Sequence, residues 1–201
     1  MQIRAGFVVL LAAAFIVGPA ADGAPVRIDC LSEIPTIIGT PGADVLVGTG
    51  GDDVINGLGG DDVIIGDYGS DVICGGDGDD RITPGGGLFE EDVVSGDAGD
   101  DAIVGGTSMI AAVYAFAPGP VTVDLGAGVS SGWGADTLVG VARVIGSQFG
   151  DTIRGNEGFN CFEGLGGADV LLGQGGDDCL AGGPGDDAIA GGGGSDRLAG
   201  G

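Results

Sequence analysis

The chain has no histidine and no lysine, and six arginines are its only basic side chains. Without histidine, neither a serine-histidine-aspartate triad nor the His-Glu-x-x-His motif of zinc proteases can be built. Without lysine, the phosphate-binding loop of nucleotide-binding proteins is excluded as well. Against the six arginines stand 30 acidic residues, which give a formal net charge of −24. This balance excludes nucleic acid as a partner and favours cations.

Long apolar runs are also lacking, apart from one at the N-terminus. Arg4 precedes an apolar stretch over residues 5–17, and small residues follow it. The stretch is too short for a transmembrane span and no later segment is long enough, so residues 1–21 are interpreted as a signal peptide. Cleavage after Ala20 or after Gly23 fits the small-residue rule, and a buried helix is the alternative. The mature chain is then expected to be secreted, and a cell-surface association stays open.

Glycine is abundant, with 48 of 201 residues, and it recurs at a fixed period. Twelve stretches follow the rule Gly-x-x-Gly-x-Asp-x-aliphatic-x. Glycine holds position 1 in all twelve, and position 4 departs only at Phe149, while aspartate holds position 6 except at Asn160. This period argues against disorder and also against collagen, where glycine recurs every third residue. The repeats begin at Gly39, Gly48, Gly57, Gly66, Gly75, Gly96, Gly146, Gly155, Gly164, Gly173, Gly182 and Gly191.

A strict nine-residue period predicts a solenoid. Positions 7 to 9 form a three-residue strand, in which the position-8 side chain points inward and its two neighbours point outward. We therefore expect an all-β fold, a parallel β-roll. Consecutive repeats would form opposite sides of a flattened coil, so that each loop stacks on the loop two repeats later.

The repeats fall into two blocks, a first roll over residues 39–106 and a second over 146–201. Residues 22–38 are expected to form a capping strand. Three inserted residues between Pro84 and Ser95 make an enlarged repeat with Asp92 at position 6. Residues 107–145 are the most apolar part of the mature chain and predict a β spacer, with a strand at 121–125 and a degenerate repeat at 131–139. Its aromatic side chains are expected to plug the ends of the two rolls, with a binding groove as the alternative.

The loops are the candidate binding sites. Glycine at positions 1 and 4 permits backbone angles closed to other residues, which would turn carbonyl oxygens toward one side. Several oxygen ligands, without nitrogen or sulfur, on a flexible loop indicate several Ca²⁺ ions. The predicted carboxylate ligands are Asp44, Asp53, Asp62, Asp71, Asp80, Asp101, Asp151, Asp169, Asp178, Asp187 and Asp196. The predicted carbonyl ligands belong to Gly39, Gly48, Gly57, Gly66, Gly75, Gly164, Gly173, Gly182 and Gly191. The position-5 residues expected to face solvent are Asp52, Asp61, Asp79, Asp100, Asp177 and Asp186.

Four cysteines in an exported chain suggest two disulfides, although three pairings are possible. Cys161 and Cys179 both hold position 7 and lie 18 residues apart in the sequence. With two repeats per coil they would lie on adjacent parallel strands about 4.8 Å apart, which is within bridging range. Cys30 would then pair with Cys74. Free thiols are the alternative.

These motifs resemble those of the RTX (repeats-in-toxin, hemolysin-type) calcium-binding family over residues 39–104 and 131–201. The resemblance implies parallel β-rolls in which the position-6 aspartates and the turn carbonyls bind calcium. Residues 121–153 are similar to a spacer found in many such proteins, and the stretch around Cys30 resembles the start of small secreted members. Many members carry an uncleaved C-terminal export signal, and most toxins and hydrolases carry a separate catalytic or pore-forming domain. Neither pattern is found in this sequence.

The sequence therefore favours an exported, non-enzymatic protein that folds and becomes rigid when calcium binds between stacked loops. A second hypothesis is an adhesive or matrix protein that self-associates through an uncapped end at Gly201. A third is an accessory module of a polysaccharide-active enzyme. Residues 128–132 match the esterase pattern Gly-x-Ser-x-Gly, but no histidine is present to complete a triad.

Overall fold

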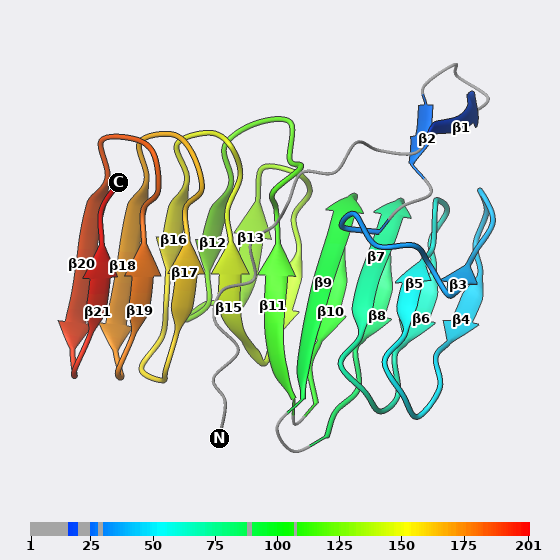
Figure 1. The fold of residues 1–201 in the computed structure, drawn as a ribbon, viewed down its shortest axis with the longest axis horizontal. Helices are drawn as coiled ribbons and strands as arrows, with labels where there is room; N and C mark the ends of the chain where they lie inside the picture. The colour runs from blue at the N-terminus through cyan, green and yellow to red at the C-terminus, as the bar shows by residue number, and fades with distance from the viewer. Residues whose placement is uncertain (1–15, 20–24, 28–29, 88–89, 107) are drawn as a thin grey trace.

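The computed structural model describes residues 16–19, 25–27, 30–87, 90–106 and 108–201. Most of the predicted signal peptide lies outside these residues, as do residues 22–24 and 28–29 of the predicted cap. Strands β1 (Ile16–Pro19) and β2 (Pro25–Arg27) pair as a small antiparallel sheet. The other described strands form two long sheets that face each other across the molecule (Figure 1). No helix is found among the described residues, so none of them forms a helix that could span a membrane.

The first long sheet has ten strands. In spatial order they are β20 (Ala188–Gly193), β18 (Val170–Gly175), β16 (Thr152–Arg154), β12 (Thr122–Asp124), β13 (Val129–Ser131), β14 (Thr137–Val139), β10 (Ala102–Val104), β8 (Arg81–Thr83), β6 (Val63–Ile65) and β4 (Val45–Val47).

The second long sheet has nine strands. In spatial order they are β21 (Arg197–Ala199), β19 (Cys179–Ala181), β17 (Cys161–Glu163), β15 (Val141–Ile145), β11 (Met109–Val113), β9 (Glu91–Ala98), β7 (Val72–Asp77), β5 (Val54–Asn56) and β3 (Ile37–Ile38).

Strand pairing within the two long sheets is parallel except around β13, which pairs antiparallel with β12 and β14. The register is that of two repeats per coil, as in the pairing of Ile55 with Ile73 and of Leu171 with Ile189. The chain therefore crosses from one sheet to the other at every repeat. This confirms the predicted parallel β-roll.

The core lies between the two sheets and is built from the position-8 side chains. On β6, Ile64 is fully buried, whereas its neighbours Val63 and Ile65 are 38% and 37% exposed on the outer face. Burial of one such isoleucine stabilises the folded state by about 2 kcal/mol, and the same inward position is repeated along both sheets. The predicted alternation of positions 7, 8 and 9 is confirmed.

Both sheets continue without a break through residues 108–145. Strands β11 and β15 extend the nine-stranded sheet, and β12 to β14 extend the ten-stranded sheet. Tyr114 is buried within the core cluster and Trp133 packs against it. The expectation that aromatic side chains plug the ends of two separate rolls is therefore wrong, because the sheets have no ends in this region.

The enlarged repeat between Pro84 and Ser95 is accommodated without a change of register. The backbone N–H of Asp71 donates to Asp92 across 21 residues, three more than the 18 that separate the unmodified repeats. Strand β9 then pairs with β7 in the common register, with Val94 opposite Ile73. The three added residues thus lie in the bend, as predicted.

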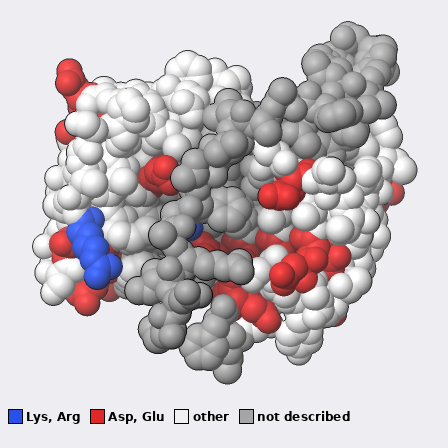
Figure 2. All heavy atoms as spheres, in the orientation of Figure 1, with Lys and Arg blue, Asp and Glu red and all other residues white. Residues whose placement is uncertain are grey.

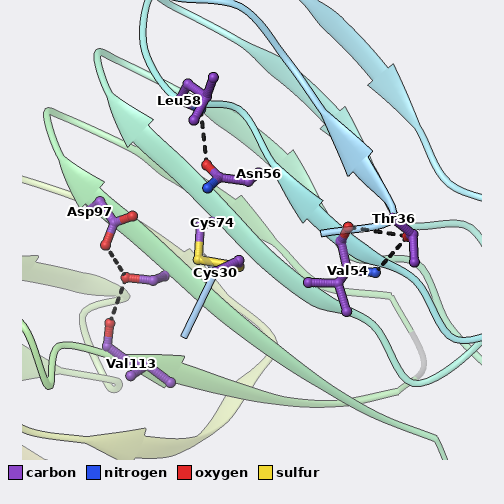
Figure 3. The surroundings of a disulfide bond; sticks show 9 residues. Cys30, Thr36, Val54, Asn56, Leu58, Cys74, Asp97 and Val113 are labelled. Carbon is purple, nitrogen blue, oxygen red and sulfur yellow. Dashed lines mark hydrogen bonds between the residues drawn. A yellow bond between two sulfur atoms is a disulfide. The ribbon is translucent and has the colours of Figure 1, made fainter. Parts of the chain in front are cut away.

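Two disulfides are present, and both match the predicted pairs. Cys161 and Cys179 join the paired strands β17 and β19, with a Cα–Cα distance of 4.6 Å. Cys30 is buried and bonds to Cys74 of β7 (Figure 3). Next to it, the Thr36 hydroxyl donates to the Val54 carbonyl (Figure 3). Residues 30–38 of the predicted cap are therefore fastened to the N-terminal end of the nine-stranded sheet, whereas residues 25–27 pair with β1.

Candidate metal centre

The position-6 side chains stack in two columns along the roll. Each column lies where the strands of one long sheet begin. In each column, the Oδ1 oxygen accepts a hydrogen bond from the backbone N–H of the position-6 residue one coil earlier, such as Asp44 N to Asp62 Oδ1 at 2.7 Å. The column of the ten-stranded sheet contains Asp44, Asp62, Asp80, Asp101, Asp136, Asp151, Asp169 and Asp187. The column of the nine-stranded sheet contains Asp53, Asp71, Asp92, Asn160, Asp178 and Asp196.

The second carboxylate oxygen, Oδ2, has no hydrogen-bond partner in seven of these aspartates, although it is buried. Asp71 is fully buried, and Asp80 and Asp101 are each only 2% exposed. A buried charged oxygen without a partner destabilises a fold by several kcal/mol, so such an atom indicates a missing ligand. The seven residues are Asp62, Asp71, Asp80, Asp101, Asp169, Asp178 and Asp187.

A backbone carbonyl lies close to five of these seven oxygens, next to the position-1 glycine; the exceptions are Asp101 and Asp187. A Cβ atom placed on Gly164 would meet both Asp169 Oδ2 and the Gly182 oxygen, the latter at 2.6 Å. Glycine thus leaves open a space between a carboxylate and a carbonyl of the next coil. The carbonyls that approach a neighbouring loop in this way belong to Gly57, Gly66, Gly75, Pro84, Gly96, Gly164, Gly173, Gly182 and Gly191.

The carbonyls of Gly39 and Gly48 are not among them, because these two loops are the first of their columns and no described repeat precedes them. Pro84 and Gly96 are additions to the sequence prediction. Pro84 holds position 1 of the enlarged repeat, which has no glycine there to reveal it, and Gly96 precedes Asp101 as the rule requires.

The expected role of the glycines is corrected by the backbone angles. Left-handed backbone occurs at positions 2 and 4 in eight of the twelve loops, as at Leu58 and Gly60, where φ is 76° and 93°. The position-1 glycines are not among the left-handed residues. Position 1 requires glycine because a side chain would occupy the space between the two oxygens, whereas in those eight loops position 4 requires it for its conformation.

The comparison with known families decides which ion fits this arrangement. A family model described as the RTX calcium-binding nonapeptide repeat matches residues 38–73, 57–88, 90–107, 145–180 and 173–201, which together span more than half of the chain. The chain belongs to this RTX family. No curated protein matches the chain. RTX membership makes the molecule a calcium-binding β-roll.

The loops of this RTX roll fit calcium by their donor chemistry. Calcium takes six to eight oxygen ligands from carboxylates and backbone carbonyls, and the open space beside position 1 is bounded by one oxygen of each kind. Among the described residues, no three His, Cys, Asp or Glu side chains gather as a metal cluster. Carbonyl oxygens next to the position-1 glycines are the other oxygens that border this space.

The electrostatics of the columns indicate that positive charge is missing. Burial, and then repulsion from neighbouring carboxylates, raises the pKa of Asp71 to about 6, of Asp80 to about 7 and of Asp101 to about 8. Burial likewise raises the pKa values of Asp62, Asp169 and Asp178. Without a cation, these carboxyl groups therefore stay protonated up to a higher pH than an ordinary aspartate does.

Asp53 differs, since hydrogen bonds outweigh its burial. Burial alone would raise its pKa, but the Thr49 N–H and hydroxyl and the Thr36 hydroxyl donate to the carboxylate and lower it. The negative charge of Asp53 is thus stabilised by the protein itself.

Two further position-6 aspartates are satisfied by hydroxyl groups from distant parts of the chain. The Ser108 hydroxyl donates to Asp92 Oδ2 at 2.5 Å. Tyr114 and Ser130 both donate to Asp136 Oδ2, at 3.0 and 2.6 Å. The nonapeptide pattern places Asp92 and Asp136 at position 6, yet nothing in it reveals these hydroxyl partners, which lie 6 to 22 residues away.

The position-5 aspartates lie outside the buried columns, as predicted. All six are exposed, and Oδ1 atoms of all but Asp186 accept backbone hydrogen bonds in another ladder, such as the bond from the Ser70 N–H to Asp52 at 2.9 Å. Figure 2 shows acidic side chains gathered on the N-terminal half of one face, where basic side chains are few. These residues surround the RTX loops with negative charge and raise the local cation concentration.

Proposed function

We propose that this RTX protein is exported, binds several Ca²⁺ ions in its stacked loops, depends on them to fold and become rigid, and catalyses no reaction. The seven buried and unpaired Oδ2 atoms carry this proposal. Each requires a proton or a cation, and the columns stack them at the strand spacing of about 4.8 Å, where like charges repel.

The position-6 aspartates and the position-1 carbonyls would hold the ions. Calcium, when bound, supplies the positive charge that neutralises neighbouring carboxylates. The chain contributes a rigid placement of its oxygens. The hydrogen bond from the Asp62 N–H to Asp80 Oδ1 fixes the carboxylate, which leaves Oδ2 toward the open space beside Gly75. Calcium binding and folding are then coupled, because the unfolded chain does not hold these oxygens together.

Export is supported by two features. The Cys30–Cys74 and Cys161–Cys179 disulfides are typical of oxidising compartments. The apolar N-terminal stretch has the pattern of a secretory signal. Extracellular calcium is commonly millimolar, a range in which loops of this kind bind.

The absence of catalysis is supported by the state of the one serine that matches a nucleophile motif. Ser130 is 5% exposed, and its hydroxyl donates to Asp136. No histidine exists in the chain to accept its proton. The serine therefore serves as a structural partner of an aspartate and lacks the base that a nucleophile needs.

The experiment is calorimetric titration of the oxidised mature chain, from about residue 22, with calcium and, separately, with magnesium. The proposal predicts saturable binding of several Ca²⁺ ions and much weaker binding of Mg²⁺, which demands octahedral geometry and keeps its water. Absence of calcium binding at millimolar concentrations would contradict the proposal.

Calcium-dependent self-association is a second candidate function. Val45 and Val47 on β4 are 72% and 53% exposed, and Val63 and Ile65 on the adjacent β6 extend the same apolar outer surface. A second copy would bury these side chains once calcium has neutralised the negative charge. Size-exclusion chromatography at saturating calcium tests this candidate, and a monomer under those conditions would exclude it.

A further inference from the structure

The twelve RTX loops fall into two backbone conformations. In eight loops, the residues at positions 2 and 4 are both left-handed, as at Leu165 and Gly167, where φ is 72° and 118°. In the other four, neither position is left-handed. We call the first kind open loops and the second kind closed loops. The closed loops begin at Gly39, Gly48, Gly146 and Gly155.

In a closed loop, the position-6 side-chain oxygen that lies beside the position-1 glycine accepts a hydrogen bond from its own repeat. In the Gly48 loop, the Thr49 N–H and hydroxyl donate to Asp53 Oδ2, at 2.6 and 2.8 Å. In the Gly146 loop, the Ser147 N–H donates to Asp151 Oδ2 at 2.5 Å and its hydroxyl donates to Oδ1 at 2.7 Å. The Gly39 and Gly155 loops make the same backbone bond, so in all four loops the side-chain oxygen beside the position-1 glycine already has a donor.

In the open loops no such bond forms. Seven of the eight position-6 aspartates keep a buried Oδ2 without a partner, and the eighth, Asp196, is in the last repeat and less buried. The peptide plane between positions 1 and 2 explains the alternative, because its N–H and C=O point in opposite directions. In the closed loops, the N–H of this peptide donates to the position-6 side chain. In the open loops, the carbonyl of this peptide approaches the loop of the preceding coil.

The residue at position 2 separates the two kinds without exception. The closed loops have Thr40, Thr49, Ser147 and Asn156, whose short polar side chains form local hydrogen bonds with the position-4 backbone. The open loops have Leu58, Asp67, Gly76, Asp97, Leu165, Gln174, Gly183 and Gly192. Short hydroxyl and amide side chains favour such turns, and β-branched threonine resists the left-handed region.

We propose that the second residue of each repeat decides whether its RTX loop takes calcium: threonine, serine or asparagine closes the loop, and the other residues leave it open. This inference rests on the proposed function, since it assigns its ions to the open loops. The closed loops come first in each block, at Gly39 and Gly48 and again at Gly146 and Gly155. Each calcium-binding tract therefore starts from loops that the chain satisfies by itself.

The experiment counts bound calcium per chain at saturation, by native mass spectrometry on the oxidised full-length mature protein. Thr49→Gly should open the Gly48 loop, because Gly51 already supplies glycine at position 4. This variant is expected to bind at least one ion more than the parent. The matched control Thr49→Ser keeps the closing hydroxyl and should bind the parental number.

The reverse change closes an open loop. Gln174→Thr should close the Gly173 loop and leave Asp178 Oδ2 hydrogen-bonded, with at least one ion lost. Gln174→Met, which has no short polar group, should keep the parental number. Circular dichroism confirms that each variant is folded, and the Gln174 pair decides the question if Thr49→Gly does not fold.

The outcomes separate the two proposals. A parent chain that binds no calcium would overturn the proposed function. A parent that binds calcium, with Thr49→Gly and Gln174→Thr both at the parental number, would overturn only the assignment of position 2. The expected result is that Thr49→Gly binds more calcium ions than the parent and Gln174→Thr binds fewer. Both control variants should bind the parental number.

Discussion

At the scale of single residues, the two oxygens of one aspartate have different roles. Oδ1 of Asp80 accepts a hydrogen bond from the backbone N–H of Asp62 and so helps to hold the column together. Oδ2 of the same side chain is buried without a partner and is therefore assigned to the proposed ion site. Asp79, the preceding residue, points to solvent. Neighbouring residues of the same type are thus expected to respond very differently to substitution.

Replacement of Asp80 by asparagine should weaken calcium binding and the stability that calcium confers. The amide keeps the shape of the side chain but loses the charge that the ion requires. A tenfold weaker site lowers the calcium-dependent stabilisation by about 1.4 kcal/mol at saturation. Urea unfolding in calcium measures this loss. The control Asp79→Asn should change stability by less than about 0.5 kcal/mol, and an equal effect of both variants would contradict the assignment.

The pH dependence of the calcium-free roll follows from the raised pKa values. Asp71, Asp80 and Asp101 have pKa values of about 6, 7 and 8 in the fold, against an ordinary 3.8. The fold therefore binds protons more tightly than the unfolded chain. The resulting stability is fully present below pH 3.8 and is lost as the pH rises through about 6 to 8.

Calcium-stripped protein should accordingly unfold at a higher urea concentration at pH 5 than at pH 8. With saturating calcium the order should reverse, because the ion requires deprotonated carboxylates. Urea titrations at the two pH values, with and without calcium, measure both trends. A calcium-free roll that is more stable at pH 8 would contradict the burial of unpaired carboxylates.

At the scale of the loop, position 1 must stay without a side chain. A Cβ on Gly57 would meet Asp62 Oδ2 and the Gly75 carbonyl, whereas a Cβ on Gly42 would meet nothing within 4 Å. Gly57→Ala should therefore destabilise the roll by about 1–3 kcal/mol, the usual cost of overpacking, and should weaken calcium binding. Gly42→Ala should leave both properties near the parental values. Thermal unfolding in calcium compares the two, and equal midpoints would contradict the argument.

The sequence predicted the elements well where the period was strict. The nine-residue rule placed the inward isoleucines, the Cys161–Cys179 pair, which left Cys30 to pair with Cys74, and Asp92 behind its three-residue insertion. The left-handed backbone at position 2 could not be predicted in this way, because Leu58, Leu165 and Gln174 are not residues that favour it. Where no short hydroxyl or amide side chain closes the loop, stacking of each loop on the next imposes this conformation, and a single repeat does not contain that contact.

At the scale of the whole molecule, both columns of carboxylates are interrupted in the middle. Ile110 pairs with Asp92, and the Val121 N–H takes the place of a position-6 N–H on Asp151. Both residues are buried and apolar. Around them, the remaining aspartates are satisfied by Ser108, Tyr114, Ser130 and Ser147. In the middle of the solenoid, these carboxylates therefore have hydrogen-bond donors from the protein itself.

Hydrogen exchange should reveal this division. Without calcium, amides of β11 to β16 are expected to be better protected than those of β6 to β8 and β18 to β20. With calcium, the two outer tracts should gain protection and the middle should change least. Mass spectrometry of exchanged peptides measures the pattern. Uniform protection in the absence of calcium, or a gain that is largest in the middle, would contradict the division.

The middle is also where sequence reasoning about the whole molecule failed. The repeat pattern loosens between residues 107 and 145, which suggested a spacer with aromatic plugs between two rolls. Strand β11 and the hairpin of β12 and β13 instead keep the same inward row of apolar side chains, such as Ala112 and Val123. The continuity of the two sheets depends on pairing between strands that are distant in the sequence, and a local repeat pattern does not predict such pairing.

The central claim is that calcium completes a fold whose buried carboxylates are otherwise unpaired. The most direct test is a calcium titration of the oxidised mature chain at pH 7.5–8, followed by far-ultraviolet circular dichroism, with magnesium as the control ion. The account predicts a cooperative gain of β signal and of thermal stability with calcium alone. A β spectrum that is already complete in chelator, with an unfolding midpoint unchanged by calcium, would contradict it.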